Sequence, residues 1–221
     1  HLSETQTEHE ECKGRHGLTP AAYMEKHGIF DSPTTAAHCV WLEDEDFDIL
    51  KRHGVTVACC PASNLKLASG YANVPKMLES GINVALGTDG AASNNNLNIM
   101  QDMYLFGVVY KGYFRDPTII TPAEVLHAAT RAGALSQGRD DSGLLAVGMR
   151  ADLCVLNTDT PQFTPMTSAA CNVVYAAQGA DIRMTMVDGE ILYRDGEFKT
   201  IDIEKVKAEV QRRTDSILSR L

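Results

Sequence analysis

Histidine and acidic residues lie at the ends of several predicted strands, where their side chains could meet and do chemistry. His1 and Glu4 stand at the first of these ends, His38 at the second and Asp89 at the last. Histidine and carboxylate are the usual ligands of zinc and iron, and a metal-bound water loses its proton near neutral pH. A neighbouring carboxylate can then carry that proton to a leaving group. These residue types therefore indicate a hydrolytic metal site, provided that the fold brings them to one place.

The stretch around Asp89 shows this pattern most plainly. An apolar run over 84–86 ends in Gly-Thr-Asp-Gly, and small and polar residues follow up to residue 96. This predicts a buried strand that delivers one carboxylate at its C-terminal end. In parallel α/β barrels, the residues at that end of the strands carry the chemistry. Alternatively, Asp89 caps the next helix or holds a turn, and this stretch by itself leaves both interpretations open.

Strands alternate with helices through the first half of the chain. This order predicts a parallel sheet with right-handed crossovers, and near-continuous apolar strands predict burial on both faces. An open doubly wound sheet fits the same order, but nothing resembles the Gly-rich phosphate loop of nucleotide-binding folds. Strands are predicted to end at His1, His38, Cys60 and Asp89, with helices over 17–28, 43–53, 74–80 and 97–113 and a loop over 62–70.

The pattern changes after Pro117. A further helix is followed by short strands that alternate polar and apolar residues, as in an antiparallel sheet with one exposed face. Asp188-Gly189 predicts a tight hairpin turn. The helix is predicted over 121–134, the strands over 152–156, 173–175, 182–187 and 190–193, and a final amphipathic helix over 202–221.

The composition argues against several classes of partner. The 221 residues carry a net charge of −9 and an isoelectric point near 5.2, so neither nucleic acid nor an anionic membrane surface is an expected partner. No apolar run approaches the ~20 residues of a membrane span, and no signal-peptide pattern is seen. The six cysteines are scattered without a CxxC pair, which is typical of free thiols in a cytoplasmic protein.

Five motifs carry a resemblance to a known family and together span most of the chain. On these motifs the chain resembles the C-terminal portion of an amidohydrolase-superfamily deaminase. The nearest group is the 5′-methylthioadenosine/S-adenosylhomocysteine deaminases, next to the atrazine-type chlorohydrolases. The matching motifs are His1-Leu2-Ser3-Glu4-Thr5, Ala36-Ala37-His38-Cys39-Val40, PASNLKLASG over 61–70, LGTDGAASNN over 86–95 and GMRADL over 148–153.

The resemblance implies an α/β fold. The chain would form the C-terminal half of a (β/α)8 barrel, strands five to eight, together with part of a small β-sandwich and a C-terminal helix. The partial barrel would occupy residues 1–148, the sandwich part 149–200 and the helix 201–221. A chain that opens directly on the motif of strand five looks cut at its N-terminus.

The resemblance also implies a role for each candidate residue. His1 would be a metal ligand, and Asp89 would bind the metal and take the proton of the attacking water. Glu4 would protonate the ring nitrogen of the substrate, and His38 would hydrogen-bond the attacking hydroxide and the developing alkoxide. Glu4, His38 and Asn64 would contact the substrate. The metal-bound hydroxide would add to an aminopurine nucleoside (5′-methylthioadenosine, S-adenosylhomocysteine or adenosine), and ammonia would leave the tetrahedral intermediate.

Two departures from the family pattern bound this prediction. The His-x-His pair that supplies two metal ligands on barrel strand one is absent, so the chain in isolation is predicted to be inactive. The expected metal of the parent protein is Zn²⁺, with Fe²⁺ as the alternative, and the expected partner is the missing N-terminal half or a second copy of this chain. Cys59-Cys60 stands where many family deaminases carry His-Asn, which leaves a chlorohydrolase, guanine deaminase or cytosine deaminase as alternatives.

Overall fold

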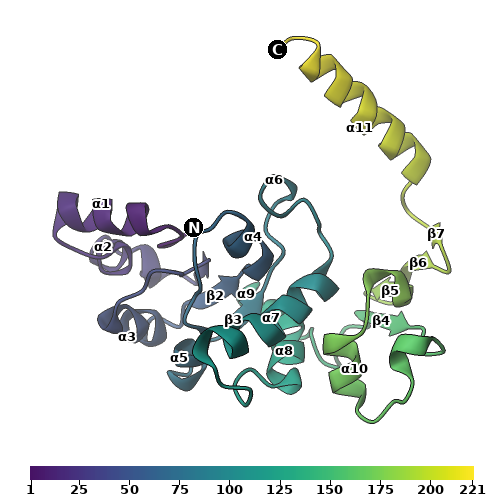
Figure 1. The fold of residues 1–221 in the computed structure, drawn as a ribbon, viewed down its shortest axis with the longest axis horizontal. Helices are drawn as coiled ribbons and strands as arrows, with labels where there is room; N and C mark the ends of the chain where they lie inside the picture. The colour runs from purple at the N-terminus through teal and green to yellow at the C-terminus, as the bar shows by residue number, and fades with distance from the viewer.

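The computed structural model describes all 221 residues. One sheet of three strands lies in the first half of the chain, and a second sheet of four strands lies towards its end (Figure 1). The first sheet consists of β1 (Thr35–Ala37), β2 (Thr56–Cys59) and β3 (Val84–Leu86) in that spatial order. All its strands are parallel, which confirms the predicted parallel sheet.

The strand predicted to end at His1 is present as a single bridge to this sheet. Leu2 pairs in parallel with His38, the residue that follows β1. The Leu2 amide donates to the Ala37 carbonyl (3.1 Å), and the Cys39 amide donates to the Leu2 carbonyl (3.0 Å). The start of the chain therefore extends the sheet on the β1 side and sets its first residues beside His38.

Helices pack on the parallel sheet and close one core. A cluster of 25 buried apolar residues runs from Leu2 to Val174 and includes Phe106 and Tyr110, both fully or almost fully buried. The helices of this part are α1 (Gln6–His16), α2 (Pro20–Lys26), α3 (Asp44–Arg52), α4 (Pro61–Lys66), α5 (Val74–Glu79), α6 (Ala91–Asn94), α7 (Ile99–Phe114), α8 (Pro122–Ala129) and α9 (Arg131–Ser136).

Two segments are helical against prediction. The loop predicted over 62–70 is wrong for its first half, because Pro61 occupies the first helical position of α4. The strand predicted over 173–175 is also wrong, since these residues end α10 (Ala169–Tyr175). Ser168 caps α10 by accepting from the Cys171 amide (3.3 Å). A short apolar run suits a strand and a buried helix equally, so its period could not decide between them.

Other helices differ from prediction only in extent. The helix predicted over 121–134 breaks into α8 and α9 at Thr130, whose φ of −126° and ψ of −87° are not helical. The Thr130 hydroxyl donates to the Leu126 carbonyl (2.7 Å), a local bond that competes with the helical pattern. The long helix predicted over 97–113 is confirmed as α7, with the short helix α6 before it.

The second sheet is antiparallel, as predicted, and follows the order of its strands in the chain. Asp188 and Gly189 both have positive φ (52° and 81°) in the tight turn between β5 and β6, which confirms the predicted hairpin. No residue of this sheet is fully buried, so both faces, and not one alone, are partly open. Its strands are β4 (Leu153–Leu156), β5 (Ile182–Val187), β6 (Glu190–Arg194) and β7 (Glu197–Phe198).

Helix α10 joins the two parts by packing against α7 and α8. A side chain at Gly107 of α7 would meet Tyr175 Cε1 at 3.1 Å and Val174 Cγ1 at 3.2 Å, so the glycine permits this close approach. The boundary at residue 148 between a barrel part and a sandwich part stays a prediction.

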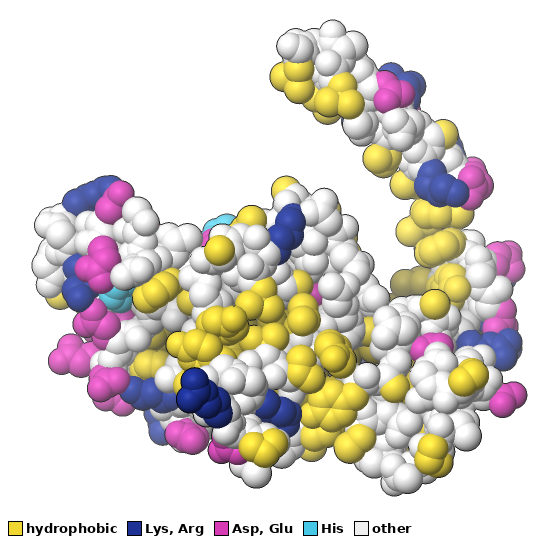
Figure 2. All heavy atoms as spheres, in the orientation of Figure 1, with side chains coloured by type: hydrophobic (Ala, Val, Ile, Leu, Met, Phe, Trp, Pro, Cys, Tyr) yellow, Lys and Arg dark blue, Asp and Glu magenta, His cyan; other side chains and the backbone are white.

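The last helix, α11 (Ile203–Leu218), projects away from the rest of the molecule (Figure 1) and has no buried residue. Figure 2 shows hydrophobic side chains along this helix, at its base, and over the middle of the same face of the body. The exposed apolar residues of α11 include Val210 and Ile217. None of the helices combines the length and the apolar character that crossing a membrane requires.

Candidate functional site

The sheet brings the candidate residues together because each follows the end of a parallel strand. His38 comes directly after β1, and Asp89 comes three residues after the end of β3 at Leu86. The bridge between Leu2 and His38 adds Glu4 from the start of the chain. Parallel strands end at the same edge of a sheet, so these side chains converge there.

Two of these candidates, His38 and Asp89, have left-handed backbone conformations, and so does Ser3 beside Glu4. The φ angles are 47° at Ser3, 71° at His38 and 61° at Asp89. Residues with a Cβ rarely adopt such angles, and they cluster where the surrounding structure holds a functional side chain. The left-handed turns redirect the chain just where each strand ends, a feature that the sequence did not signal.

His38 is held between an amide and a carboxylate. Its Nδ1 lies 2.9 Å from Asn64 Oδ1, and its Nε2 lies 3.6 Å from Glu4 Oε2. Since Asn64 presents a carbonyl oxygen, Nδ1 is the donor of this bond and Nε2 faces Glu4. The His38 side chain is 1% exposed and that of Glu4 is 21% exposed. The His1 ring stacks on His38 with 5.5 Å between centroids.

Asn64 is the one predicted site residue whose placement changes its interpretation. It is buried in α4, and its Oδ1 is directed to His38 rather than to open space. Its Nδ2 is buried and has no hydrogen-bond partner in the protein. An unpaired buried donor is unusual, and it leaves this amide able to bind a further acceptor.

Asp89 is held ionised by neighbouring donors. Burial alone would raise the pKa of its carboxyl group. The Ser63 hydroxyl donates to Oδ2 (2.6 Å), and the Gly90 amide donates to Oδ1 (2.7 Å). Together with the electrostatic influence of nearby His38, these donors outweigh burial and keep the pKa of Asp89 below its usual value. An ionised carboxylate at this place can bind a cation or accept a proton.

Glu4 is oriented through both its side chain and its backbone. The Ser69 hydroxyl lies 3.4 Å from Glu4 Oε1 and is placed to donate to it. The Glu8 carboxylate accepts from the Glu4 amide (2.8 Å) and from the Ser3 amide (3.0 Å). Glu8 therefore fixes the turn that carries Glu4, and sequence patterns alone did not single it out.

The chain by itself does not complete a metal site. No three His, Cys, Asp or Glu side chains come together in a group that could hold a metal ion. The predicted ligands of this chain, His1 and Asp89, number one fewer than the three protein ligands of catalytic zinc sites. The donor set of this chain is therefore suited to a metal in kind but incomplete in number for a catalytic site.

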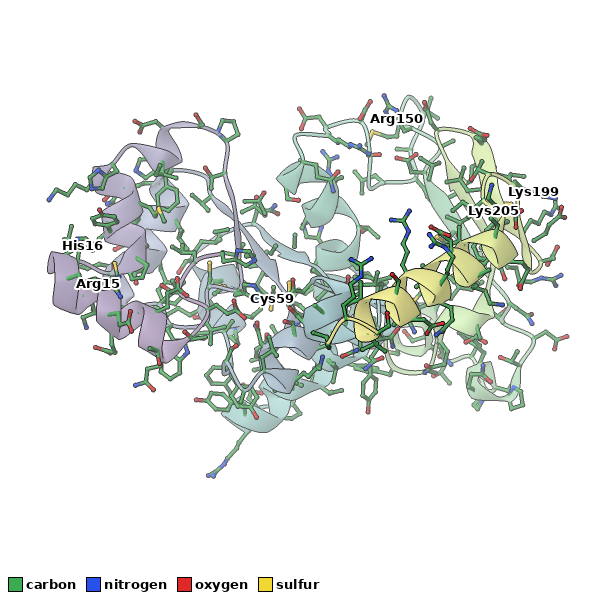
Figure 3. The ribbon with its side chains drawn as sticks, turned by 90° about the horizontal axis from the view of Figure 1, so that it is seen from above. Arg15, His16, Cys59, Arg150, Lys199 and Lys205 are labelled. Carbon is green, nitrogen blue, oxygen red and sulfur yellow. The ribbon has the colours of Figure 1, made fainter.

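The cysteines next to the site are inert thiols. Burial raises the pKa of Cys59 and of Cys60 to about 12. Cys59 lies in the middle of the molecule (Figure 3), and its Sγ is 3.0 Å from the Tyr110 hydroxyl. A thiol with such a pKa carries almost no thiolate at neutral pH, so Cys60 is not placed to act as a nucleophile.

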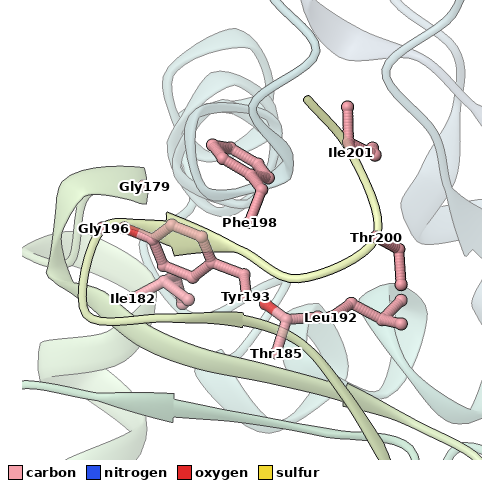
Figure 4. Close-up of a pocket in the computed structure, with 9 residues that line it drawn as sticks. All are labelled: Gly179, Ile182, Thr185, Leu192, Tyr193, Gly196, Phe198, Thr200 and Ile201. Carbon is pink, nitrogen blue, oxygen red and sulfur yellow. The ribbon is translucent and has the colours of Figure 1, made fainter. Parts of the chain in front are cut away.

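A cavity lies elsewhere, against the antiparallel sheet. It has a volume of about 560 Å³, and its lining includes Ile182, Leu192, Tyr193, Phe198 and Ile201 (Figure 4). None of the candidate residues lines it. The cavity is an uncovered apolar face of the sheet and not the place of the chemistry.

Comparisons with known proteins agree on one family. The model of the amidohydrolase family matches residues 1–192. A 5-methylthioadenosine/S-adenosylhomocysteine deaminase of Dictyoglomus thermophilum is 43% identical over 220 residues, which is 100% of this chain and 52% of the relative. The chain thus spans about half the length of the curated relatives that it matches.

Two solved structures have the same fold over nearly the whole chain. A zinc-bound adenosine deaminase from Xanthomonas campestris has a TM-score of 0.95 and 29% identity, and the match covers 99% of this chain and 50% of that one. A zinc complex of atrazine chlorohydrolase from Arthrobacter aurescens has a TM-score of 0.88 and 26% identity, covering 96% and 47% of the two chains.

Proposed function

The chain belongs to the amidohydrolase family, and we propose that it supplies the C-terminal half of a metal-dependent hydrolase that deaminates adenosine-like purines. The observation that carries the proposal is that Glu4, His38 and Asp89 all follow strand ends at one edge of the parallel sheet, with 3.6 Å between His38 Nε2 and Glu4 Oε2. The substrate class is supported by the names of the relatives, such as the D. thermophilum deaminase of 5-methylthioadenosine and S-adenosylhomocysteine.

The proposed roles follow the chemistry of each side chain. Glu4, which is partly exposed, donates a proton to the ring nitrogen of the purine. His38, held by Asn64, directs Nε2 to the attacking oxygen. Asp89, ionised, accepts the proton of the attacking water. The free Nδ2 of Asn64 supports a contact with the substrate as well.

The complete protein needs more metal ligands than this chain provides. We propose Zn²⁺, with Fe²⁺ as the alternative, because the structurally similar adenosine deaminase and chlorohydrolase were crystallised with zinc. His1 and Asp89 would be this chain's ligands. Two ligands hold a metal weakly, so we expect the 221 residues alone to be inactive.

The uncovered apolar surfaces support the proposal of a half barrel with part of a sandwich. The open sheet face around Leu192 and Phe198, and the unburied α11, both lack a cover within this chain. We propose that the other half of a full-length protein, or else a second copy of this chain, packs there. In the first case residues 1–148 contribute barrel strands five to eight.

A chlorohydrolase is the second candidate. The likeness to atrazine chlorohydrolase supports it, together with Cys59-Cys60 where many family deaminases have His-Asn. A deaminase displaces ammonia with water and a chlorohydrolase displaces chloride with water, by the same kind of mechanism. The two candidates therefore differ in substrate and not in the roles of Glu4 and Asp89.

The test is to join this chain to the N-terminal half of the D. thermophilum relative and assay the zinc-loaded chimera. We expect ammonia release from 5′-methylthioadenosine and S-adenosylhomocysteine, and none from the 221 residues alone. Glu4→Gln and Asp89→Asn should each lower kcat by about 10²-fold or more, since each removes a proton-transfer group.

The control in the same chimera is Asp152→Asn, which changes a carboxylate just before β4 of the other sheet and should leave kcat within about twofold. Chloride release from atrazine without ammonia release from the nucleosides would favour the chlorohydrolase. Turnover by the chain alone would contradict its proposed dependence on a second half.

A further inference from the structure

All three proposed catalytic side chains are supported by the segment that follows β2. Ser63 donates to Asp89 (2.6 Å), Asn64 accepts from His38 (2.9 Å), and Ser69 lies within reach of Glu4 (3.4 Å). The first two belong to α4, which is six residues long. A helix this short cannot hold its own conformation, so something outside it must.

The outside support is Asp102 of α7. The residue before α4, Cys60, provides no side-chain cap. Instead Asp102 Oδ1 accepts from the backbone amide of Ala62 (3.1 Å). Ala62 lies in the first turn of α4, where backbone amides have no acceptor within the helix. Helix α4 packs against both α6 and α7, and the three helices can be followed in Figure 1. Asp102 thus caps α4 from a distant part of the chain.

The second oxygen of the same carboxylate supports the strand end that carries Asp89. Asp102 Oδ2 accepts from Asn94 Nδ2 (3.1 Å), and Nδ2 also donates to the carbonyl of Thr88 (2.7 Å). Thr88 immediately precedes Asp89, whose backbone is left-handed. One buried carboxylate therefore ties together the two turns from which Ser63, Asn64 and Asp89 emerge.

We infer that Asp102 is a positioning residue of the active site, which sets the directions of His38 and Asp89 through α4 and Asn94. The inference rests on the proposed roles of His38 and Asp89. Asp102 is 0% exposed, and no Lys or Arg pairs with it. A buried carboxylate bonded only to neutral donors is costly, so a role in placing the site accounts for it better than stability does.

Asp181 offers a matched control for a purely structural role. It is also buried (6% exposed) and also accepts from one backbone amide, that of Gln178 (2.8 Å), and one side-chain amide, that of Gln162 (2.8 Å). None of these residues contacts the site. In Asp102→Asn and in Asp181→Asn, one of the two accepting carboxylate oxygens is replaced by an NH2 donor. Both variants should therefore lower the midpoint of thermal unfolding.

The experiment is NMR on the labelled 221-residue protein, without metal or substrate. We expect Asp102→Asn to shift the ring ¹⁵N resonances of His38 and the carboxyl ¹³C resonance of Asp89, and Asp181→Asn to leave both in place. The inference would be overturned if both variants lowered the unfolding midpoint equally and Asp102→Asn left the His38 and Asp89 resonances unmoved.

A second variant keeps the test decisive if Asp102→Asn does not fold. Asn94→Ala removes the arm to Thr88 and leaves the cap on Ala62, so the Asp89 resonance should move while that of His38 stays. An unmoved Asp89 resonance would refute the role of Asn94 in this arm. Because no turnover is measured, a failed deaminase assay would contradict the proposed function without changing this result.

Discussion

The parallel sheet and the antiparallel sheet of this chain differ in how far each closes on itself. The cluster of 25 buried apolar residues draws on β1, β2, β3 and the helices around them, and its last member is Val174. The antiparallel sheet has no fully buried strand residue, and α11 has none either. Both regions come from one continuous sequence, yet the strands of the second sheet and α11 bury none of their apolar side chains fully.

The contrast shows where the chain is self-sufficient. Hydrophobic burial is the main favourable term in folding, so the parallel-sheet region can hold its site residues within this chain. The antiparallel sheet keeps an apolar face open around the cavity in Figure 4. Open apolar faces of this kind are typical of interaction surfaces, in agreement with the proposal that a second half packs there.

The greatest loss of stability is expected inside the closed core. Phe106→Ala removes a fully buried ring from α7 and should lower the free energy of unfolding by about 3–5 kcal/mol. The matched change Ile217→Ala, at a residue 60% exposed on α11, should cost less than about 0.5 kcal/mol. Urea unfolding followed by the fluorescence of Trp41, the single tryptophan, measures both. A large cost for Ile217→Ala would show that α11 is packed in solution.

A smaller effect is expected at the connection between the regions. Gly143 has a φ of +82°, and a Cβ there would lie 2.8 Å from the backbone Cα of Arg131. Gly138 has a similar φ of +68° but open space around it. Gly143→Ala should therefore cost about 1–3 kcal/mol more than Gly138→Ala, since both carry the backbone strain and only the first adds a clash. Equal midpoints in urea would refute the interpretation of a tight connection.

The smallest expected effect concerns two carboxylates, one from each region. The pH dependence of their contributions to stability should have opposite signs. Burial raises the pKa of Asp102 above 3.8, so its contribution to stability is full below pH 3.8 and is lost as pH rises through the folded pKa. The Ser142 hydroxyl and the Asp188 amide lower the pKa of Asp152. Its contribution is present above pH 3.8 and is lost as pH falls through the folded pKa.

Unfolding of Asp102→Asn and Asp152→Asn across acidic pH measures this sign. The stability advantage of the native protein over Asp102→Asn should shrink as pH rises, and its advantage over Asp152→Asn should shrink as pH falls. Each variant serves as the control for the other. Slopes of the same sign would contradict the opposite environments of the two carboxylates.

Local patterns along the chain were enough to predict the parallel strands, the Asp188-Gly189 hairpin and the residue types of the site. Apolar runs, Asp-Gly turns and strand-end histidines are each visible within a few residues, so no distant contact is needed to recognise them. The motifs around His38 and Asp89 indicated the family for the same reason, because each is a continuous run of residues.

The supports of those residues, in contrast, depend on the tertiary fold. The helix over 61–66 is capped by Asp102, which lies 40 residues away from Ala62 along the chain. The end of α10 packs as a helix because Gly107 of α7 leaves it room. Asn64 faces His38 because α4 turns it there. Contacts between distant segments depend on where the whole fold places them, and neither local propensity nor hydrophobic period contains that information.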